Sequence, residues 1–237
     1  IKKWKYSPAL ENGEPIQQCK NSIQMDFRMS NVENGARKRF VRKYNQIKTL
    51  IIDGKTVEAE EELVKLRNKG SWNLYEDAFY WYLSSLYFRV TEDIDKEYRD
   101  ILKLADLGEE KLPKDSYVGL MYRGFQLALH QNQFSTAKYF SKRIKRNDKA
   151  LFDKIAPTLD KIDDVKNGNL DIVVAGSIDE RQNWFHYLYR NNFTIAEVNG
   201  SIDAIEVRCN NTRHSFVFAE NQTWNIPDSW QDCRLMV

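Results

Sequence analysis

Three histidines and three cysteines are the residues of this sequence best suited to act as nucleophile, base or soft metal ligand. A metal site needs clustered ligands, and a catalytic nucleophile needs a base within hydrogen-bond reach. None of His130, His186 and His214 has a second histidine or a cysteine at metal-ligand spacing, and the sequence contains no HExxH, CxxC, GxGxxG or P-loop motif. We therefore expect no metal, no cofactor and no catalytic residue, and we expect that the protein is not an enzyme.

Two cysteines near the C-terminus have a structural interpretation instead. Cys209 closes one predicted strand and Cys233 opens the last one. A disulfide between them would restrict the unfolded chain by roughly 3 kcal/mol, and it would leave Cys19 unpaired. The alternatives are two buried free thiols, or a catalytic pair of Cys209 with His214 across a predicted hairpin. We expect the disulfide.

The domain that contains Cys209 and Cys233 is expected to begin near Gly168, where the composition of the sequence changes. Residues 31–168 carry 26 basic and 22 acidic side chains, a balance of +4. Residues 169–237 carry five arginines, no lysine and nine acidic side chains, a balance of −4, and they are rich in asparagine. The sequence therefore predicts a domain boundary here, with a helical domain at 31–168 and a second domain at 169–237.

Residues 169–237 show the short alternating pattern of a small antiparallel β-domain. The apolar runs 172–175 and 193–198 predict two strands, and Asn199-Gly200 predicts a hairpin turn after the second. Alternation over 205–209 and again around Phe216 predicts a further hairpin. Such a small domain has a marginal hydrophobic core, which is why a disulfide would matter.

From Ala36 onward, apolar residues recur at helical spacing. Asn73 followed by Glu76 predicts a capping box at the start of the most aromatic helix, and Gly108 predicts the end of the next one. We interpret the aromatic helix as core packed on two sides, with cofactor stacking or carbohydrate binding as the alternative. The last helix is expected to contain Pro157 and to kink there.

Turns recur at a fixed interval in the helical domain. The stretches 53–59 and 131–137 are 78 residues apart, with a turn near Asp93 halfway between them. Three helix pairs at a spacing of 39 residues indicate a solenoid. The units resemble tetratricopeptide repeats, although they are longer and Tyr98 replaces the small residue of the middle copy. Such a solenoid would offer a concave face to a protein or peptide.

Charge and hydropathy limit the other partners. Two basic runs, 37–43 and 142–146, could contact phosphate or an acidic partner, and a solvated helix face is the interpretation that we prefer. The net charge of +2 gives no reason to expect a nucleic-acid partner. No run of 18 apolar residues exists, so we expect no membrane span within this chain.

The N-terminal stretch combines a turn with a strand pattern. The run 11–15 contains Asn12-Gly13 and Pro15, which redirect a chain. Beyond it, Ile23, Met25 and Phe27 alternate with polar residues, as in a half-buried β-strand.

This order resembles the end of the C-terminal domain of the TonB family of bacterial energy transducers. That domain finishes with a helix running into a basic-basic-Trp-basic-Tyr-x-Pro signature, a loop and a last edge strand. The matching segments are Lys2–Pro8, Asn12–Pro15 and the strand around Ser22–Arg28, within about 29 of 237 residues. The family's earlier strands, first helix, proline-rich linker and membrane anchor are not present, so we expect a fragment of a longer protein.

The resemblance implies a partner-binding strand and a location. The strand would offer an unpaired edge to the N-terminal segment of an outer-membrane transporter, and an inner-membrane motor complex would be the second partner. The location would be periplasmic, with an inner-membrane anchor in a segment missing from this chain, and this oxidising compartment would permit the disulfide. The partner-binding residues would be Ser22, Ile23, Gln24, Met25, Asp26, Phe27 and Arg28.

A second hypothesis keeps the periplasmic location but assigns the function to the helices. In it the protein is an adaptor whose concave helical face binds another protein, and the N-terminal strand is structural. Under both hypotheses the expected fold class is α+β. It comprises a partial TonB-like helix-strand segment at 1–30, a tetratricopeptide-like α-helical solenoid at 31–168, and a small antiparallel β-domain at 169–237.

Overall fold

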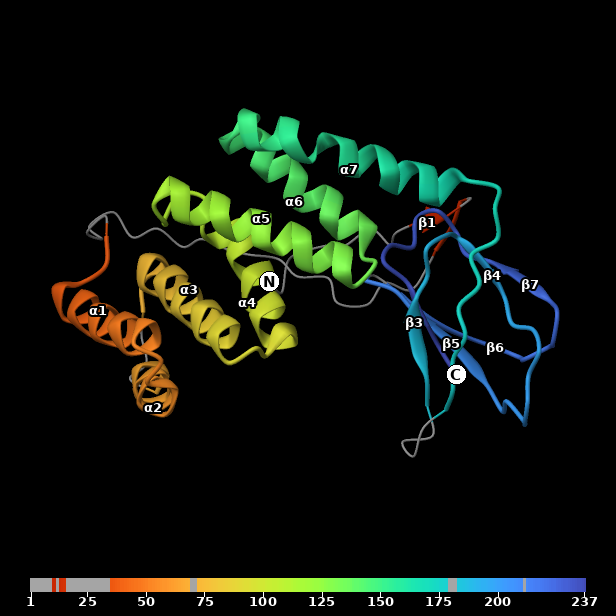
Figure 1. The fold of residues 1–237 in the computed structure, drawn as a ribbon, viewed down its shortest axis with the longest axis horizontal. Helices are drawn as coiled ribbons and strands as arrows, with labels where there is room; N and C mark the ends of the chain where they lie inside the picture. Colours follow the sequence, from red (N-terminus) through yellow and green to blue (C-terminus); the bar gives the residue numbers. More distant parts are fainter. Residues whose placement is uncertain (1–9, 12, 16–34, 69–71, 179–182, 211) are drawn as a thin grey trace. The chain divides into compact units, whose positions relative to one another are not determined.

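The computed structural model describes residues 10–11, 13–15, 35–68, 72–178, 183–210 and 212–237 (Figure 1). Over these residues seven helices precede a small antiparallel sheet region, which confirms the α+β class. The chain forms two compact units. One comprises the described parts of 26–129 and 137–156, and the other those of 1–25, 130–136 and 157–237.

A short hairpin is the described part of the N-terminal stretch. Strand β1 (Leu10–Glu11) pairs antiparallel with β2 (Glu14–Pro15), and Gly13 has a positive φ of 87°. Glycine adopts this conformation without a steric penalty, so the predicted turn is confirmed. The preceding helix end and the predicted strand Ser22–Arg28 lie outside the described residues.

The helices begin and end close to the positions that the sequence predicts. The predicted capping box at α3 is confirmed, because Asn73 Oδ1 accepts from the Glu76 backbone N–H at 2.9 Å. Gly108 follows α4 as its C-cap, and the last helix continues through Pro157. The helices are α1 (Lys38–Ile52), α2 (Thr56–Arg67), α3 (Leu74–Val90), α4 (Ile94–Leu107), α5 (Lys114–His130), α6 (Phe134–Asn147) and α7 (Lys149–Asn167).

The turns after α1 and α3 share one geometry. After α1, the Lys55 N–H donates to Leu50 O at 2.9 Å, and after α3 the Asp93 N–H donates to Phe88 O at 2.9 Å. These are the six-to-one hydrogen bonds of the Schellman motif, which needs one residue in the left-handed conformation. That residue is Gly54 in the first turn and Glu92 in the second, with φ of 71° and 59°, and Asn132 between α5 and α6 has a similar φ of 56°.

Glu76 joins the start of α3 to the residues before α1. Arg37 donates to its carboxylate through Nε at 2.8 Å and through Nη2 at 2.6 Å, and the Arg37 backbone N–H donates at 3.0 Å. Burial would raise the pKa of Glu76, but the hydrogen bonds from Arg37 and Asn73 outweigh it, and the pKa lies below its ordinary value. The carboxylate therefore stays charged and fixes α1 against α3.

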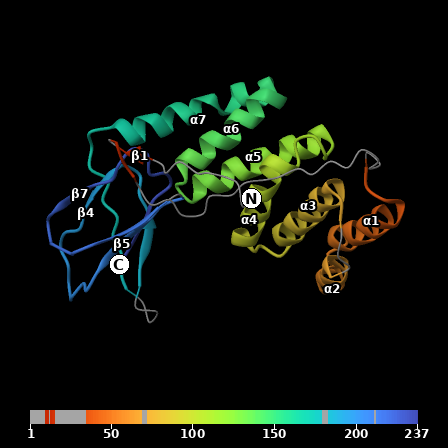
Figure 2. The same ribbon diagram turned by 180° about the vertical axis from the view of Figure 1, so that it is seen from behind.

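Helix α3 is the central helix of the group α1 to α4. It contacts α1, α2 and α4, and it lies beside α4 in both ribbon views (Figure 1, Figure 2). Contact with several helices confirms the predicted packing on two sides. The buried core here comprises Phe40, Ile47, Ile51, Ala59, Leu63, Leu66, Tyr80, Leu83 and Tyr87.

Close contacts continue the helical core from α4 to α6. Ala105 O accepts from Tyr117 Oη at 2.6 Å and from Arg143 Nε at 2.8 Å, so one carbonyl of α4 holds both later helices. Gly124 lies under the Phe140 ring, where a Cβ would approach to 2.6 Å. A side chain at this position of α5 would push α6 away.

The C-terminal sheet has four strands in the order β3-β8-β5-β6, all antiparallel, and β4 pairs with β7 in a separate ribbon. Ile205, Val207 and Leu235 on one face of the sheet are buried, and Trp224 of the ribbon packs in the same cluster. The strands are β3 (Phe185–Tyr187), β4 (Asn192–Thr194), β5 (Ile205–Arg208), β6 (Arg213–Phe216), β7 (Thr223–Asn225) and β8 (Arg234–Met236).

Two sequence predictions for this region are wrong. Residues 172–175 form no strand, and their side chains are exposed, since they pair with none of the described strands. Asn199-Gly200 does not close a hairpin, since β4 pairs with β7, about 30 residues away, rather than with β5. The predicted hairpin of β5 and β6 is confirmed.

Glu97 is the buried centre of an ion-pair network on α4. Its side chain is 1% exposed, and it accepts from Arg89 at 2.7 Å and from Arg123 at 3.0 and 2.8 Å. Burial would raise the pKa of Glu97, but the hydrogen bonds and charges of the two arginines lower it below the ordinary value of 4.5. The carboxylate links α3, α4 and α5.

We predict that Glu97→Gln lowers the free energy of unfolding at neutral pH by about 2 kcal/mol, because two arginines lose their charged partner. Since the folded pKa is lowered, this contribution is complete above pH 4.5 and is lost as pH falls through the lower folded value. The difference between wild type and Glu97→Gln in urea unfolding should therefore shrink below pH 4.5.

The matched control is Glu58→Gln on the exposed first turn of α2, which should change stability by at most about 0.5 kcal/mol. An equal loss in both variants would contradict the assignment of the network.

Candidate functional site

The residues predicted to bind a partner strand, Ser22–Arg28, lie outside the described residues. Their pairing therefore stays a prediction. The structure does describe the remaining predicted residues, and it separates the histidines from one another. His130 ends α5, His186 lies in β3 and His214 lies in β6. No group of three or more histidines, cysteines, aspartates or glutamates is placed to hold a metal ion within the described ranges.

The two sheet histidines occupy aromatic surroundings. His186 stacks on Trp184 with ring centroids 5.9 Å apart, and burial lowers its pKa. Its Nε2 is buried and has no hydrogen-bond partner among the described residues. His214 contacts Phe216 and Trp230. Among the described residues, neither imidazole has the carboxylate partner that a general base usually has.

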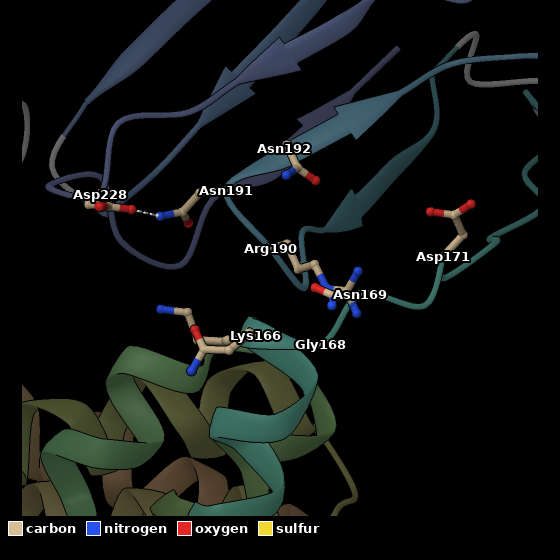
Figure 3. A pocket seen from close by; sticks show the side chains of 9 residues that line it. Lys166, Gly168, Asn169, Asp171, Arg190, Asn191, Asn192 and Asp228 are labelled. Carbon is tan, nitrogen blue, oxygen red and sulfur yellow. Dashed lines mark hydrogen bonds between the residues drawn. The ribbon is translucent and has the colours of Figure 1, made fainter.

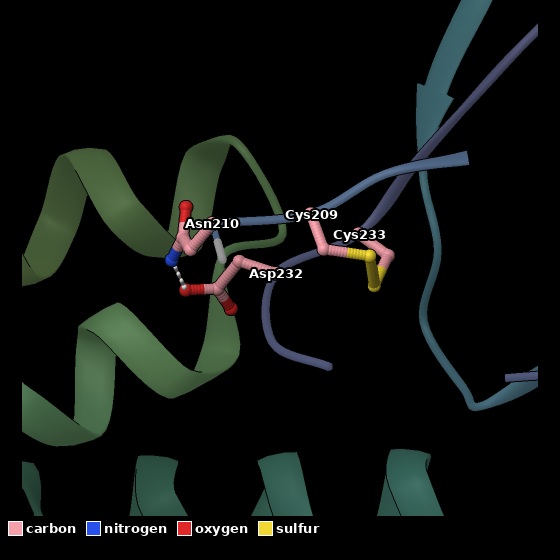
Figure 4. Close-up of a disulfide and its surroundings, with 4 residues drawn as sticks. All are labelled: Cys209, Asn210, Asp232 and Cys233. Atoms are coloured by element: carbon pink, nitrogen blue, oxygen red, sulfur yellow. Dashed lines mark hydrogen bonds between the residues drawn. A yellow bond between two sulfur atoms is a disulfide. The ribbon is translucent and has the colours of Figure 1, made fainter. Parts of the chain in front are cut away.

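Cys209 and Cys233 form a disulfide, and the sheet register explains why they meet (Figure 4). Arg208 in β5 lies opposite Arg234 in β8, so the next pair outward along the two strands is Cys209 and Cys233. Their Cα atoms are 3.9 Å apart. With both sulfurs bonded, Cys209 is no free nucleophile, and the Cys-His pair with His214 does not form.

Asp232, beside the disulfide, caps the first turn of α6. Its carboxylate accepts from the backbone N–H groups of Ser135 at 2.8 Å and Thr136 at 2.9 Å, and from Thr136 Oγ1 at 2.5 Å. Asn210 Nδ2 donates to the same carboxylate at 3.0 Å (Figure 4). An acidic group at a helix N-terminus accepts hydrogen bonds from N–H groups that have no partner within the helix, and its negative charge interacts favourably with the positive end of the helix dipole.

A polar pocket of about 530 Å³ lies at the end of α7 (Figure 3). Arg190 crosses it, and its Nε donates to Val165 O at 2.9 Å in the last turn of the helix. Gly168 leaves room for this side chain, because a Cβ there would lie 3.2 Å from Arg190 Nη2 and 2.7 Å from Asp164 O. The lining residues are Lys166, Asn167, Gly168, Asn169, Asp171, Arg190, Asn191, Asn192 and Asp228.

The chemistry of the pocket is that of hydrogen bonding. Lys166 and Arg190 supply charged donors, Asp171 and Asp228 supply charged acceptors, and the asparagines supply both. Asp228 already accepts from Asn191 Nδ2. The charges of the lining are balanced, so the pocket has no preference for an anion. Its described lining contains no aromatic ring on which a sugar could stack. The pocket was not anticipated from the sequence, in which its lining reads as a turn-rich linker.

Comparisons with protein-family models, with curated proteins and with solved structures gave no match for this chain. In the described part of the chain, no helix has both the length and the apolar character needed to cross a bilayer.

We predict that replacing both Cys209 and Cys233 by alanine lowers the free energy of unfolding of the C-terminal sheet by about 3 kcal/mol, because the 24-residue separation is no longer closed in the unfolded chain. Mass spectrometry without reductant should show the cross-linked peptides in the wild type. Cys19→Ala is the matched control and should leave both results unchanged. Two free thiols in protein from its native compartment would contradict the bridge.

Proposed function

We propose that this chain is the periplasmic part of a TonB-like energy transducer, which binds the N-terminal segment of an outer-membrane transporter by strand addition. The observation that carries the proposal is the sequence order Lys2–Pro8, Asn12–Pro15 and Ser22–Arg28. Support comes from the described hairpin of β1 and β2, which redirects the chain between the first and last of these segments. The helical region and the disulfide-linked sheet would extend the transducer.

Strand addition suits a protein that transmits force. The main-chain N–H and C=O groups of an edge strand bind an incoming strand, and the side chains select the partner. With Ile23, Met25 and Phe27 facing their own domain, Gln24, Asp26 and Arg28 would face outward. An inner-membrane motor complex would then pull along the chain, and no covalent bond would be made or broken.

A second candidate function is a periplasmic adaptor that binds a protein or peptide on the concave face of tetratricopeptide-like helix pairs. The specific observation in its favour is the recurrence of left-handed residues in the turns, at 54, 92 and 132. Repeated helix pairs with equivalent turns stack with a constant rotation, which produces an extended concave surface.

A peptide-binding measurement separates the two candidates. We predict that deleting Ile23–Arg28 abolishes binding of a peptide from a transporter N-terminus, measured by isothermal titration calorimetry with the whole chain. Asp26→Pro should weaken binding about tenfold, because proline removes a backbone donor from the edge. The matched variant Asp26→Ala keeps that donor and should stay within about twofold.

Undiminished binding by the deletion variant would refute strand addition at this segment. It would assign the peptide to another surface, as the adaptor hypothesis expects.

A further inference from the structure

The register of the sheet places three arginines in one row. Arg208 of β5 lies directly opposite Arg213 of β6 and directly opposite Arg234 of β8, and Arg234 lies opposite Tyr187 of β3. Directly paired residues in an antiparallel sheet point to the same face. The buried residues Val207 and Leu235 point to the other face, so the arginine row lies on the outer face.

Such a row is unfavourable without an anion. Like charges directly opposite one another on neighbouring strands destabilise a sheet. Glu206 pairs with both Arg208 and Arg213, so one carboxylate serves two guanidinium groups. Arg234 has no carboxylate at ion-pair distance among the described residues, and its guanidinium lies over the Phe185 ring, 5.6 Å from the centroid.

The arginine row contrasts with the charge of its domain. Residues 169–237 contain nine acidic side chains and five arginines, and three of those five lie in this row. In a domain with a balance of −4, their position on a single face is a local concentration of positive charge. Guanidinium groups bind phosphate and carboxylate oxygens through paired hydrogen bonds, so the face is complementary to anions.

Apolar side chains share the outer face with the arginines. Phe185 is on this face and 54% exposed, and Met236 lies directly opposite it. Tyr187, which lies opposite Arg234, points to the same face. The exposed segment 170–178 is not part of this face, because Gly176 lies under the ring of Trp184, which packs with the core on the inner face.

We propose that the outer face of the four-stranded sheet binds the surface of a membrane that contains anionic phospholipids. Arg208, Arg213 and Arg234 bind headgroup phosphates, and Phe185 and Met236 enter the interface below them. Peripheral membrane binding combines these two contributions, basic residues for the headgroups and exposed aromatic or aliphatic residues for the acyl boundary. The inference does not depend on the strand-addition proposal, because its residues lie outside 1–30.

Two observations favour a membrane over other anions. A soluble phosphate compound usually binds in a concave site that encloses it. The arginine row lies on the open face of a sheet, and none of its residues lines the pocket at the end of α7. An acidic peptide would satisfy the arginines but would leave Phe185 exposed. A lipid surface accommodates both the charged row and the apolar residues.

The test uses the whole chain and sedimentation with lipid vesicles. Binding is expected to vesicles of phosphatidylcholine with phosphatidylglycerol, to be much weaker with phosphatidylcholine alone, and to fall as salt rises. Arg213→Gln and Arg234→Gln should each lower the partition coefficient about fivefold, and the double variant about 25-fold. Lys161→Gln, an equal charge change on exposed α7, is the matched control and should have little effect.

Further variants keep the test decisive. Replacing Arg213 and Arg234 by lysine retains the charge and should retain most of the binding. Phe185→Ser should weaken binding to anionic vesicles by a few fold without changing the salt dependence. Circular dichroism and thermal unfolding check that each variant is folded, and if the double glutamine variant is not, the single variants and the lysine variant decide.

Three results would overturn the proposal. One is equal binding to neutral and anionic vesicles. Another is unchanged binding after loss of Arg213 and Arg234. The third is arginine-dependent binding of pyrophosphate or of a poly-glutamate peptide without binding to vesicles, which would assign the row to a soluble phosphate compound or to an acidic protein.

Discussion

The register of β5 against β8 is the constraint on which the C-terminal sheet depends. Side chains alternate between faces with a period of two, so a shift of one residue would carry the arginines into the core and the core residues to the surface. The disulfide between Cys209 and Cys233 closes the end of this strand pair and fixes its register. The same register brings Asp232 next to the first turn of α6. One covalent bond therefore supports the core, the outer face and a helix cap.

Buried carboxylates have the corresponding role among the helices. Glu76 and Glu97 are almost fully buried, and each is held by arginine from a different segment, Arg37 for the first and Arg89 with Arg123 for the second. A buried carboxylate without such partners would be strongly destabilising, so each pair fixes which helices lie together. Burial of apolar side chains, such as those around Tyr80 and Leu83, adds non-specific stabilisation. The scaffold thus combines non-specific burial with a few specific ion pairs.

Local signals in the sequence predicted local structure. The capping box of Asn73 and Glu76, the turn at Gly13 and the hairpin of β5 and β6 each depend on residues close together in the chain. The wrong predictions involve long-range pairing: residues 172–175 carry a strand pattern but lack a partner strand, and β4 pairs with β7 beyond the expected hairpin. The cap by Asp232 and the arginine row were not anticipated either, because both follow from a register that joins distant segments.

The most direct test of this account is the pairing of β5 with β8 in solution. Nuclear Overhauser spectroscopy on the oxidised protein should show the cross-strand contacts of Val207 with Leu235, since these two residues lie directly opposite one another. With that register, Arg208, Arg213 and Arg234 share the outer face. Contacts that instead place Val207 directly opposite Arg234 or Met236 would show a register shifted by one residue, and they would contradict both the arginine row and the core described above.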